Sequence, residues 1–155
     1  MKIYTKTGDE GFSDVLQKRV KKSDKIFDLI GTLDKLNAVL SLAYNFCAKD
    51  EVKVEIADLQ RKIVGLNGKI AGFSEFDFDV SYFEEKIDFY SEKTVGFSLY
   101  DMPQKKDSAF INLARTVCRE AERTAVDIDE KNIDLIRCLN RMSDYLYAVG
   151  KYLDI

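Results

Sequence analysis

Three arginines and a glutamate share one side of a helix that the sequence predicts over Ser108–Asp127. Arg115, Arg119, Glu122 and Arg123 are spaced i, i+4, i+7 and i+8, so their side chains form one stripe. The planar guanidinium group binds phosphate oxygens in a bidentate way, and a carboxylate among the arginines would hold their geometry. The stripe therefore predicts an anion site. An ordinary solvated helix face has the same spacing and remains the alternative.

The first 24 residues lack helical periodicity and are rich in small turn-forming residues. Glycine lets backbone amides approach a ligand closely, and consecutive amides form an anion-binding nest. A basic cluster, Lys18, Arg19, Lys21 and Lys22, follows. The pattern indicates phosphate binding weakly, since no Gly-Lys-Ser/Thr ends it as in a P-loop. An ordinary polar loop is the alternative.

Five helices must position these residues. Besides the arginine helix, the apolar spacing predicts a helix from a Ser23 or Asp24 cap to about Phe46, and others at about Lys53–Gly72, Ser81–Lys93 and Lys131–Leu153. Short connections between amphipathic helices predict an all-α fold, an antiparallel five-helix bundle with an irregular N-terminal loop. We expect residues 1–155 to form one domain.

Composition excludes several classes of function. The net charge of −3 argues against non-specific nucleic-acid binding. The absence of histidine excludes imidazole acid–base chemistry and His metal sites. Three widely spaced cysteines indicate reduced thiols and a cytoplasmic location. We expect neither a membrane span nor an export signal, because no apolar run approaches ~20 residues.

Three separated pieces resemble one enzyme family. The first is Tyr4–Gly11, continuing through Arg19–Asp24 to Gly31–Asn37; the second is Ala114–Arg123; the third is Leu139–Leu146. Together they resemble the ATP:cob(I)alamin adenosyltransferases of the trimeric five-helix-bundle type, and the resemblance spans nearly the whole chain.

The resemblance implies a reaction. Enzymes of this kind bind ATP, Mg²⁺ and reduced cobalamin, and the Co(I) centre attacks the 5′ carbon of ATP, giving adenosylcobalamin and triphosphate. The nucleophile belongs to the cofactor, so no protein histidine or reactive cysteine is needed. The family also implies a homotrimer with sites at subunit interfaces, and a reductase or cobalamin-dependent enzyme as a further partner.

The resemblance also assigns roles to residues. Arg119 and Phe97 are implied to be catalytic, Phe97 by displacing the lower ligand of cobalamin; a plain packing role for Phe97 is the alternative. Asn140 is implied to coordinate Mg²⁺, and Asp34 to pair with Arg115 of a neighbouring subunit. The residues implied to bind ATP are Thr5, Lys6, Thr7, Gly8, Ser13, Asp14, Lys22, Arg119, Glu122, Arg123 and Asn140.

Four departures from the family pattern mark this chain. Leu16-Gln17-Lys18 replaces a Gly-Gly pair, Glu120 replaces a second arginine, and Lys35 replaces a glutamate. Residues 100–104 replace the Pro-Gly-Gly that usually follows the lower-ligand phenylalanine. Glu120 reverses a charge beside the expected triphosphate site. The alternatives are therefore a relative that binds nucleotide or corrinoid without turnover, and a helical interaction protein without ATP affinity.

Overall fold

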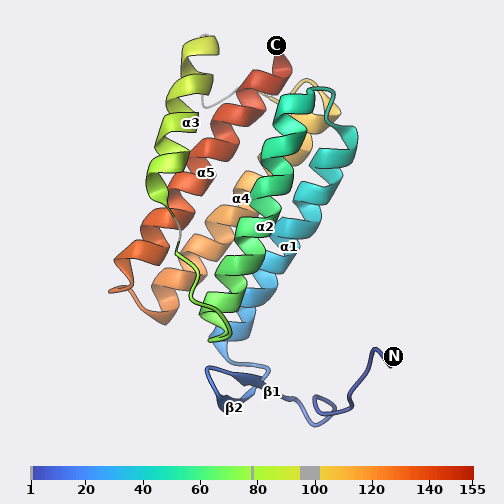
Figure 1. Ribbon diagram of the computed structural model, residues 1–155, viewed down its shortest axis with the longest axis vertical. Helices are drawn as coiled ribbons and strands as arrows, with labels where there is room; N and C mark the ends of the chain where they lie inside the picture. The colour runs from blue at the N-terminus through green and yellow to red at the C-terminus, as the bar shows by residue number, and fades with distance from the viewer. Residues whose placement is uncertain (1, 78, 95–101) are drawn as a thin grey trace.

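The computed structural model describes residues 2–77, 79–94 and 102–155, which form a bundle of five helices with a small hairpin at one end (Figure 1). The helices are α1 (Lys25–Phe46), α2 (Asp50–Ile70), α3 (Val80–Lys93), α4 (Lys106–Ile128) and α5 (Ile133–Asp154). The predicted helical bundle is confirmed, and the predicted ends lie within three residues of these bounds.

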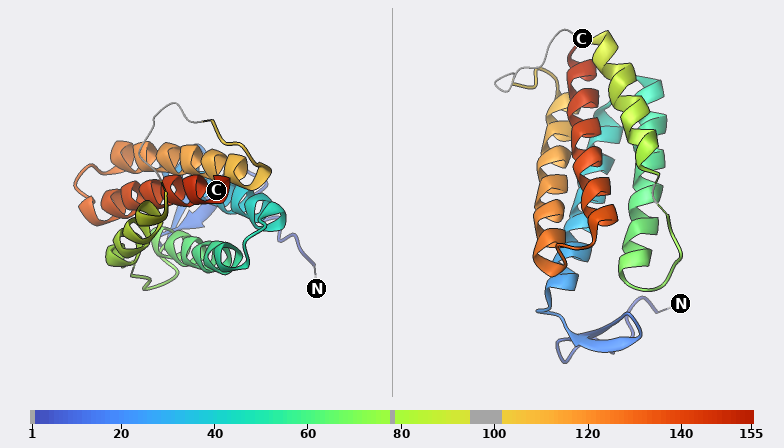
Figure 2. Two further views of the ribbon diagram at one scale, coloured as in Figure 1. Left: turned by 90° about the horizontal axis from the view of Figure 1, so that it is seen from above. Right: turned by 90° about the vertical axis from the view of Figure 1, so that its left-hand side faces the viewer.

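Consecutive helices alternate in direction, as the short connections predict (Figures 1 and 2). The closest packing joins α4 to both α5 and α1, with further contacts of α3 with α5 and of α1 with α2. The neighbouring helices α3 and α5 run in the same direction, because they are the third and the fifth of five helices that alternate in direction. Helix α4 is therefore held on two sides.

The start of the first helix follows its sequence signal. Asp24 is the N-cap of α1, and its Oδ1 accepts a hydrogen bond of 3.0 Å from the backbone amide of Ile26. Leu33, Leu36 and Leu40 of this helix are fully buried, as their spacing predicts. In the described residues, no helix is long and apolar enough to cross a membrane.

The segment before α1 is more regular than the sequence predicts. Strands β1 (Phe12–Val15) and β2 (Lys18–Lys21) form an antiparallel hairpin that pairs Ser13 with Val20 and Asp14 with Arg19. The usual Asn-Gly or Gly-rich hairpin turn is absent, since Leu16-Gln17 connects the strands. Four-residue strands with that turn give too weak a sequence signal to be recognised.

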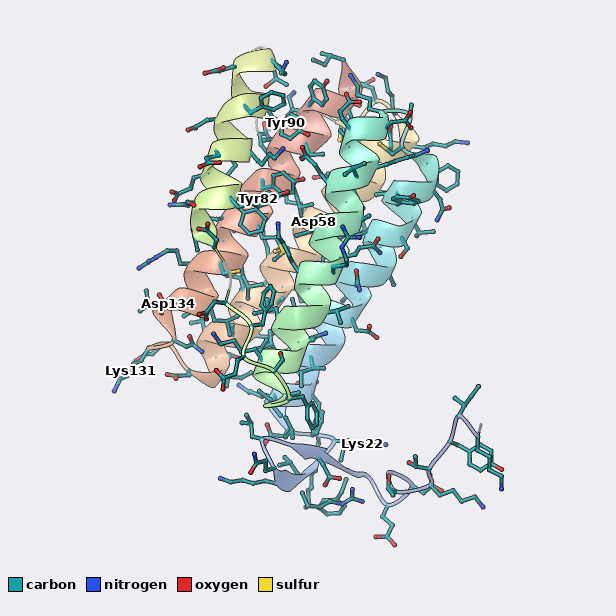
Figure 3. The ribbon with its side chains drawn as sticks, in the orientation of Figure 1. Lys22, Asp58, Tyr82, Tyr90, Lys131 and Asp134 are labelled. Carbon is teal, nitrogen blue, oxygen red and sulfur yellow. The ribbon has the colours of Figure 1, made fainter. Side chains whose placement is uncertain are left out.

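A partly buried carboxylate ties α3 and α5 to α2. Glu55 Oε2 accepts hydrogen bonds of 2.9 Å from the hydroxyls of both Tyr90 and Tyr145, and Oε1 lies 2.5 Å from Lys86 Nζ. Burial raises the pKa of both phenols, so they stay protonated and can donate. Figure 3 shows Tyr82 and Tyr90 directed from α3 toward this interior. The charge of this partly buried carboxylate is thereby compensated by a lysine and two hydroxyls.

We expect Glu55→Ala to lower the free energy of unfolding by about 3 kcal/mol, because two buried hydroxyls lose their acceptor. Urea denaturation followed by circular dichroism measures the change. Glu85→Ala, an exposed position on the same helix as Tyr90, is the matched control and should cost less than about 0.5 kcal/mol. Equal losses in the two variants would contradict the role given to Glu55.

Candidate functional site

A groove of about 880 Å³ runs between α3, α4 and α5. Arg115 and Arg119 of α4 line one wall, and α5 adds Tyr147 and Lys151. Thr94, at the end of α3, lies at its edge, directly before residues 95–101 in the chain. Charges of both signs line the groove, since the carboxylates of Glu84, Asp88 and Asp144 accompany Arg115, Arg119, Arg141 and Lys151.

The two predicted arginines differ in how they are held. Arg115 is half-buried and its Nε donates to Asn112 Oδ1 at 2.9 Å, which fixes the direction of the guanidinium. Arg119 is exposed, and in the described part of the chain it makes no ion pair. A positioned cation beside an uncommitted one suits an anionic ligand such as a triphosphate.

Arg141 also lines the groove but is already neutralised. Its Nε donates to Glu84 Oε1 at 3.1 Å and its Nη1 to Asp144 Oδ2 at 3.2 Å. The hydrogen bond to Glu84 is the main cause of the raised pKa of Arg141. Arg141 therefore joins α3 to α5 as a brace of the groove. Sequence reasoning assigned it no role, although its i, i+3 spacing to Asp144 is a visible signal.

The other residues predicted on these helices lie outside the groove. Glu122, Arg123 and Asn140 are not among the described residues that line it, although Arg123 and Asn140 are both exposed. Phe97 lies outside the described residues, as do residues 98–101. The arginine stripe of α4 is thus divided, with Arg115 and Arg119 facing the groove and Arg123 lying beyond it.

The structure gathers the predicted N-terminal residues around one turn. Lys22 Nζ donates to the carbonyl oxygen of Gly8 at 2.9 Å, and Arg19 donates to the carbonyl oxygen of Thr7. The hydroxyls of Thr5 and Thr7 lie 2.8 Å apart. A Cβ on Gly8 would lie 2.8 Å from Lys22 Nζ, so a larger residue here would displace the end of the lysine side chain.

Two further residues shape the same turn. Lys6 has a φ of 63°, a left-handed conformation that turns the chain back on itself. Arg19 also pairs with Asp14, at 3.5 Å between Nη1 and Oδ1. Arg19 belongs to the basic cluster, but sequence reasoning gave it no place in the site. Its contacts, together with that of Lys22, hold the loop onto the hairpin.

Within one chain the two groups of predicted residues lie apart. The hairpin and the N-terminal segment extend beyond the lower end of the bundle, where Figure 3 marks Lys22 (Figures 1 and 3). The groove instead reaches Thr94 and Lys151, near the opposite end. Asp34 is exposed and forms no ion pair with Arg115 in the described chain. A single copy therefore does not assemble the predicted nucleotide site.

Two departures from the family pattern meet in space. Lys35 Nζ of α1 lies 2.6 Å from Glu120 Oε2 of α4, and each side chain is about half exposed. The lysine and the glutamate each reverse the charge that the family pattern predicts at their positions, and in this chain they attract each other. Glu120 is therefore neutralised within the chain and leaves the charges of Arg115 and Arg119 unopposed by it.

The fold is thus a five-helix bundle whose groove between α3, α4 and α5 carries Arg115 and Arg119. The family model described as Cobalamin adenosyltransferase matches residues 3–153. The chain belongs to this family, and the family predicted from the sequence is confirmed.

Relatives and solved structures agree along the whole chain. Corrinoid adenosyltransferase of Bacillus subtilis is 29% identical over 99% of this chain and 87% of the relative. Corrinoid adenosyltransferase MMAB of Mus musculus is 31% identical over 97% of this chain and 72% of the relative. A variant PduO-type ATP:corrinoid adenosyltransferase from Lactobacillus reuteri, complexed with cobalamin and ATP, superposes with a TM-score of 0.89 at 25% identity, covering 99% of this chain and 91% of that one.

Exchanging charges tests the pair between α1 and α4. We expect Lys35→Glu to lower the free energy of unfolding by about 1 kcal/mol, because two carboxylates would then face each other. Adding Glu120→Lys should recover most of that loss, since the attraction returns with the opposite polarity. Urea denaturation of the single and double variants gives the coupling energy. Strictly additive effects would show that the two side chains do not interact in solution.

Proposed function

We propose that this chain is a corrinoid adenosyltransferase, which transfers the 5′-deoxyadenosyl group of ATP to the Co(I) centre of reduced cobalamin. The match of the family model to residues 3–153 carries the proposal. The groove adds support, since Arg119 offers an uncommitted guanidinium beside the fixed Arg115. The predicted activity and enzyme class follow from the family to which the chain belongs.

The reaction matches what this chain can supply. Co(I) provides the electron pair for the new Co–C5′ bond, and the C5′–O bond breaks with its pair leaving on triphosphate. No protein nucleophile takes part, in keeping with a chain that has no histidine and three buried cysteines. The protein must align two substrates and stabilise the charge of the leaving triphosphate, which is the task of fixed guanidinium groups.

We also propose that the nucleotide site forms between two copies in a homotrimer. The N-terminal turn carrying Thr5, Thr7 and Gly8 lies beyond one end of its own bundle. Arg119 lies in a groove that reaches the other end. A neighbouring copy would supply the turn to this groove, with Asp34 of one subunit pairing with Arg115 of the next. Of the other predicted ATP ligands, Ser13 and Asp14 lie on β1 and Lys22 directly follows β2. Glu122 and Arg123 lie on α4, and Asn140 lies on α5.

Mg²⁺ would enter with the nucleotide. In the described residues there is no group of three or more acidic or cysteine side chains that would hold a metal alone. Mg²⁺ commonly keeps its waters and binds one or two protein groups together with substrate phosphates. The exposed Asn140 would be such a group. The metal would neutralise part of the triphosphate charge.

We place the reaction in the cytoplasm, with a reductase and a cobalamin-dependent enzyme as partners. Cys47, Cys118 and Cys138 are free and buried. Burial raises the pKa of the Cys138 thiol to about 12, so the thiol stays protonated and unreactive. Reduced thiols of this kind suit a reducing compartment. Formation of Co(I) requires an external reductant, and the product serves an acceptor enzyme.

Binding without turnover remains the second candidate, because residues 100–104 depart from the family pattern. Incubation with ATP, Mg²⁺ and chemically reduced cobalamin separates the two. Appearance of adenosylcobalamin and triphosphate supports the transferase. Stabilisation by MgATP without product supports the binding protein. Absence of both leaves a helical interaction protein.

In that assay we expect Arg119→Ala to lower kcat/KM by at least about 100-fold, because a charge aimed at the leaving group is lost. The melting temperature should stay within about 2 °C of wild type, since the side chain is exposed. Arg61→Ala, an exposed arginine of α2 remote from the groove, is the control and should keep full activity. Unfolding of Arg119→Ala would show a structural role instead.

Asp34→Ala tests the proposed subunit contact. We expect a larger share of monomer at micromolar concentration and a weaker ATP affinity, because Arg115 of the next subunit loses its partner. Sedimentation velocity measures the assembly and calorimetry the affinity. An unchanged trimer with full affinity would refute the contact.

A further inference from the structure

The turn of the hairpin adopts a conformation that its residues do not favour. Leu16 and Gln17 connect β1 to β2 with φ values of 50° and 58°, both in the left-handed region. Positive φ at both positions is the pattern of a type I′ turn, for which Asn-Gly is preferred. Side chains with a Cβ are strained there, so contacts elsewhere must hold the turn.

Such contacts exist at the end of α2. This helix ends in a Schellman motif, in which the amide of Gly72 donates to Lys69 O and the amide of Phe73 donates to Gly68 O. The carbonyl oxygen of Ala71 accepts instead from the backbone amide of Leu16 at 2.8 Å. The tip of the hairpin thus satisfies an acceptor that the helix end leaves open.

Leu16 also packs closely on Gly72. A Cβ on Gly72 would lie 2.9 Å from Leu16 Cδ2 and 3.0 Å from Leu16 Cα. Gly72 therefore has two roles: it adopts a φ of 80°, and its missing side chain leaves space for Leu16. Leu16 further lines an apolar hollow of about 740 Å³ together with Ile70 and Phe76. Its side chain is half exposed, whereas the preceding Val15 is buried.

The docked tip is linked through the strands of the hairpin to the N-terminal turn. From Leu16 the ladder pairs Val15 with Lys18 and Asp14 with Arg19. Arg19 then binds the carbonyl oxygen of Thr7. A continuous set of contacts therefore runs from the end of α2 to the turn that is proposed to bind ATP.

We propose that Leu16 is a positioning residue, which docks the hairpin on the end of α2 and so sets where the N-terminal turn is presented to ATP. The proposal rests on the function proposed above. The ordinary Gly-Gly turn would form without strain but would carry no side chain to dock. In this chain Leu16 gives up a favourable backbone conformation at the turn, and its side chain instead docks the hairpin on the end of α2.

Leu16→Gly and Gln17→Gly form a matched pair for the test. Each removes one strained left-handed residue from the same turn, but only Leu16→Gly removes the anchor. Leu16→Met keeps an apolar side chain of similar volume and serves as the conservative rescue. Hydrogen exchange of residues 5–22 in the absence of ATP reports docking, and KM for ATP and kcat report its consequence.

We expect Leu16→Gly to speed exchange of residues 5–22 by at least fivefold and to raise KM for ATP by at least fivefold, with kcat within twofold. This split arises because the turn holds the nucleotide equally before and during transfer. Gln17→Gly and Leu16→Met should match wild type in both measurements. Similar effects of the two glycine variants, or unchanged exchange in Leu16→Gly, would overturn the proposal.

The two proposals fail separately. Wild-type protein that makes no adenosylcobalamin would refute the transferase function, while exchange would still decide whether Leu16 docks the hairpin. Active wild type, with fast exchange but unchanged KM in Leu16→Gly, would refute the positioning role and leave the transferase function intact.

Discussion

The packing of α4 between α1 and α5 is the constraint on which the rest of the structure depends. Ala114, Cys118, Ala121 and Ala125 are all buried, so small side chains let both neighbours approach. Once this side is buried, the rest of the helix must face outward. The arginines are therefore presented by a rigid element rather than by a loop, which keeps Arg115 and Arg119 at fixed positions along one groove.

Charge pairing divides the polar residues into those that build the bundle and those left for a ligand. Glu55 binds two tyrosine hydroxyls and a lysine inside the bundle, and Arg141 is shared by two carboxylates across α3 and α5. Lys35 and Glu120 neutralise each other between α1 and α4. Arg119 differs from these paired groups, because it is exposed and forms no ion pair with the described part of its own chain. Arg119 is the charge that we propose faces the triphosphate.

The N-terminal hairpin follows a different principle, because its shape depends on docking rather than on its own residues. Leu16 and Gln17 hold unfavourable backbone angles while the tip binds the end of α2. The turn carrying Thr7 and Gly8 is held in place by Arg19 and Lys22. An element anchored at one tip and projecting beyond its own bundle is suited to reach a neighbouring molecule, in line with the proposed intersubunit site.

The sequence by itself determined the bundle, the buried faces and the family. Helical periodicity and the three motifs can be read from neighbouring residues along one chain, without knowledge of the contacts between helices. Leu33, Leu36 and Leu40 are buried as their spacing requires. Only the tertiary structure decided which charges are free. Lys35 and Glu120 lie far apart in sequence, so their ion pair cannot be predicted without knowing that α1 packs on α4. The hairpin was likewise hidden, because long-range contacts at Ala71 and Gly72 outweigh the turn preferences of Leu16 and Gln17.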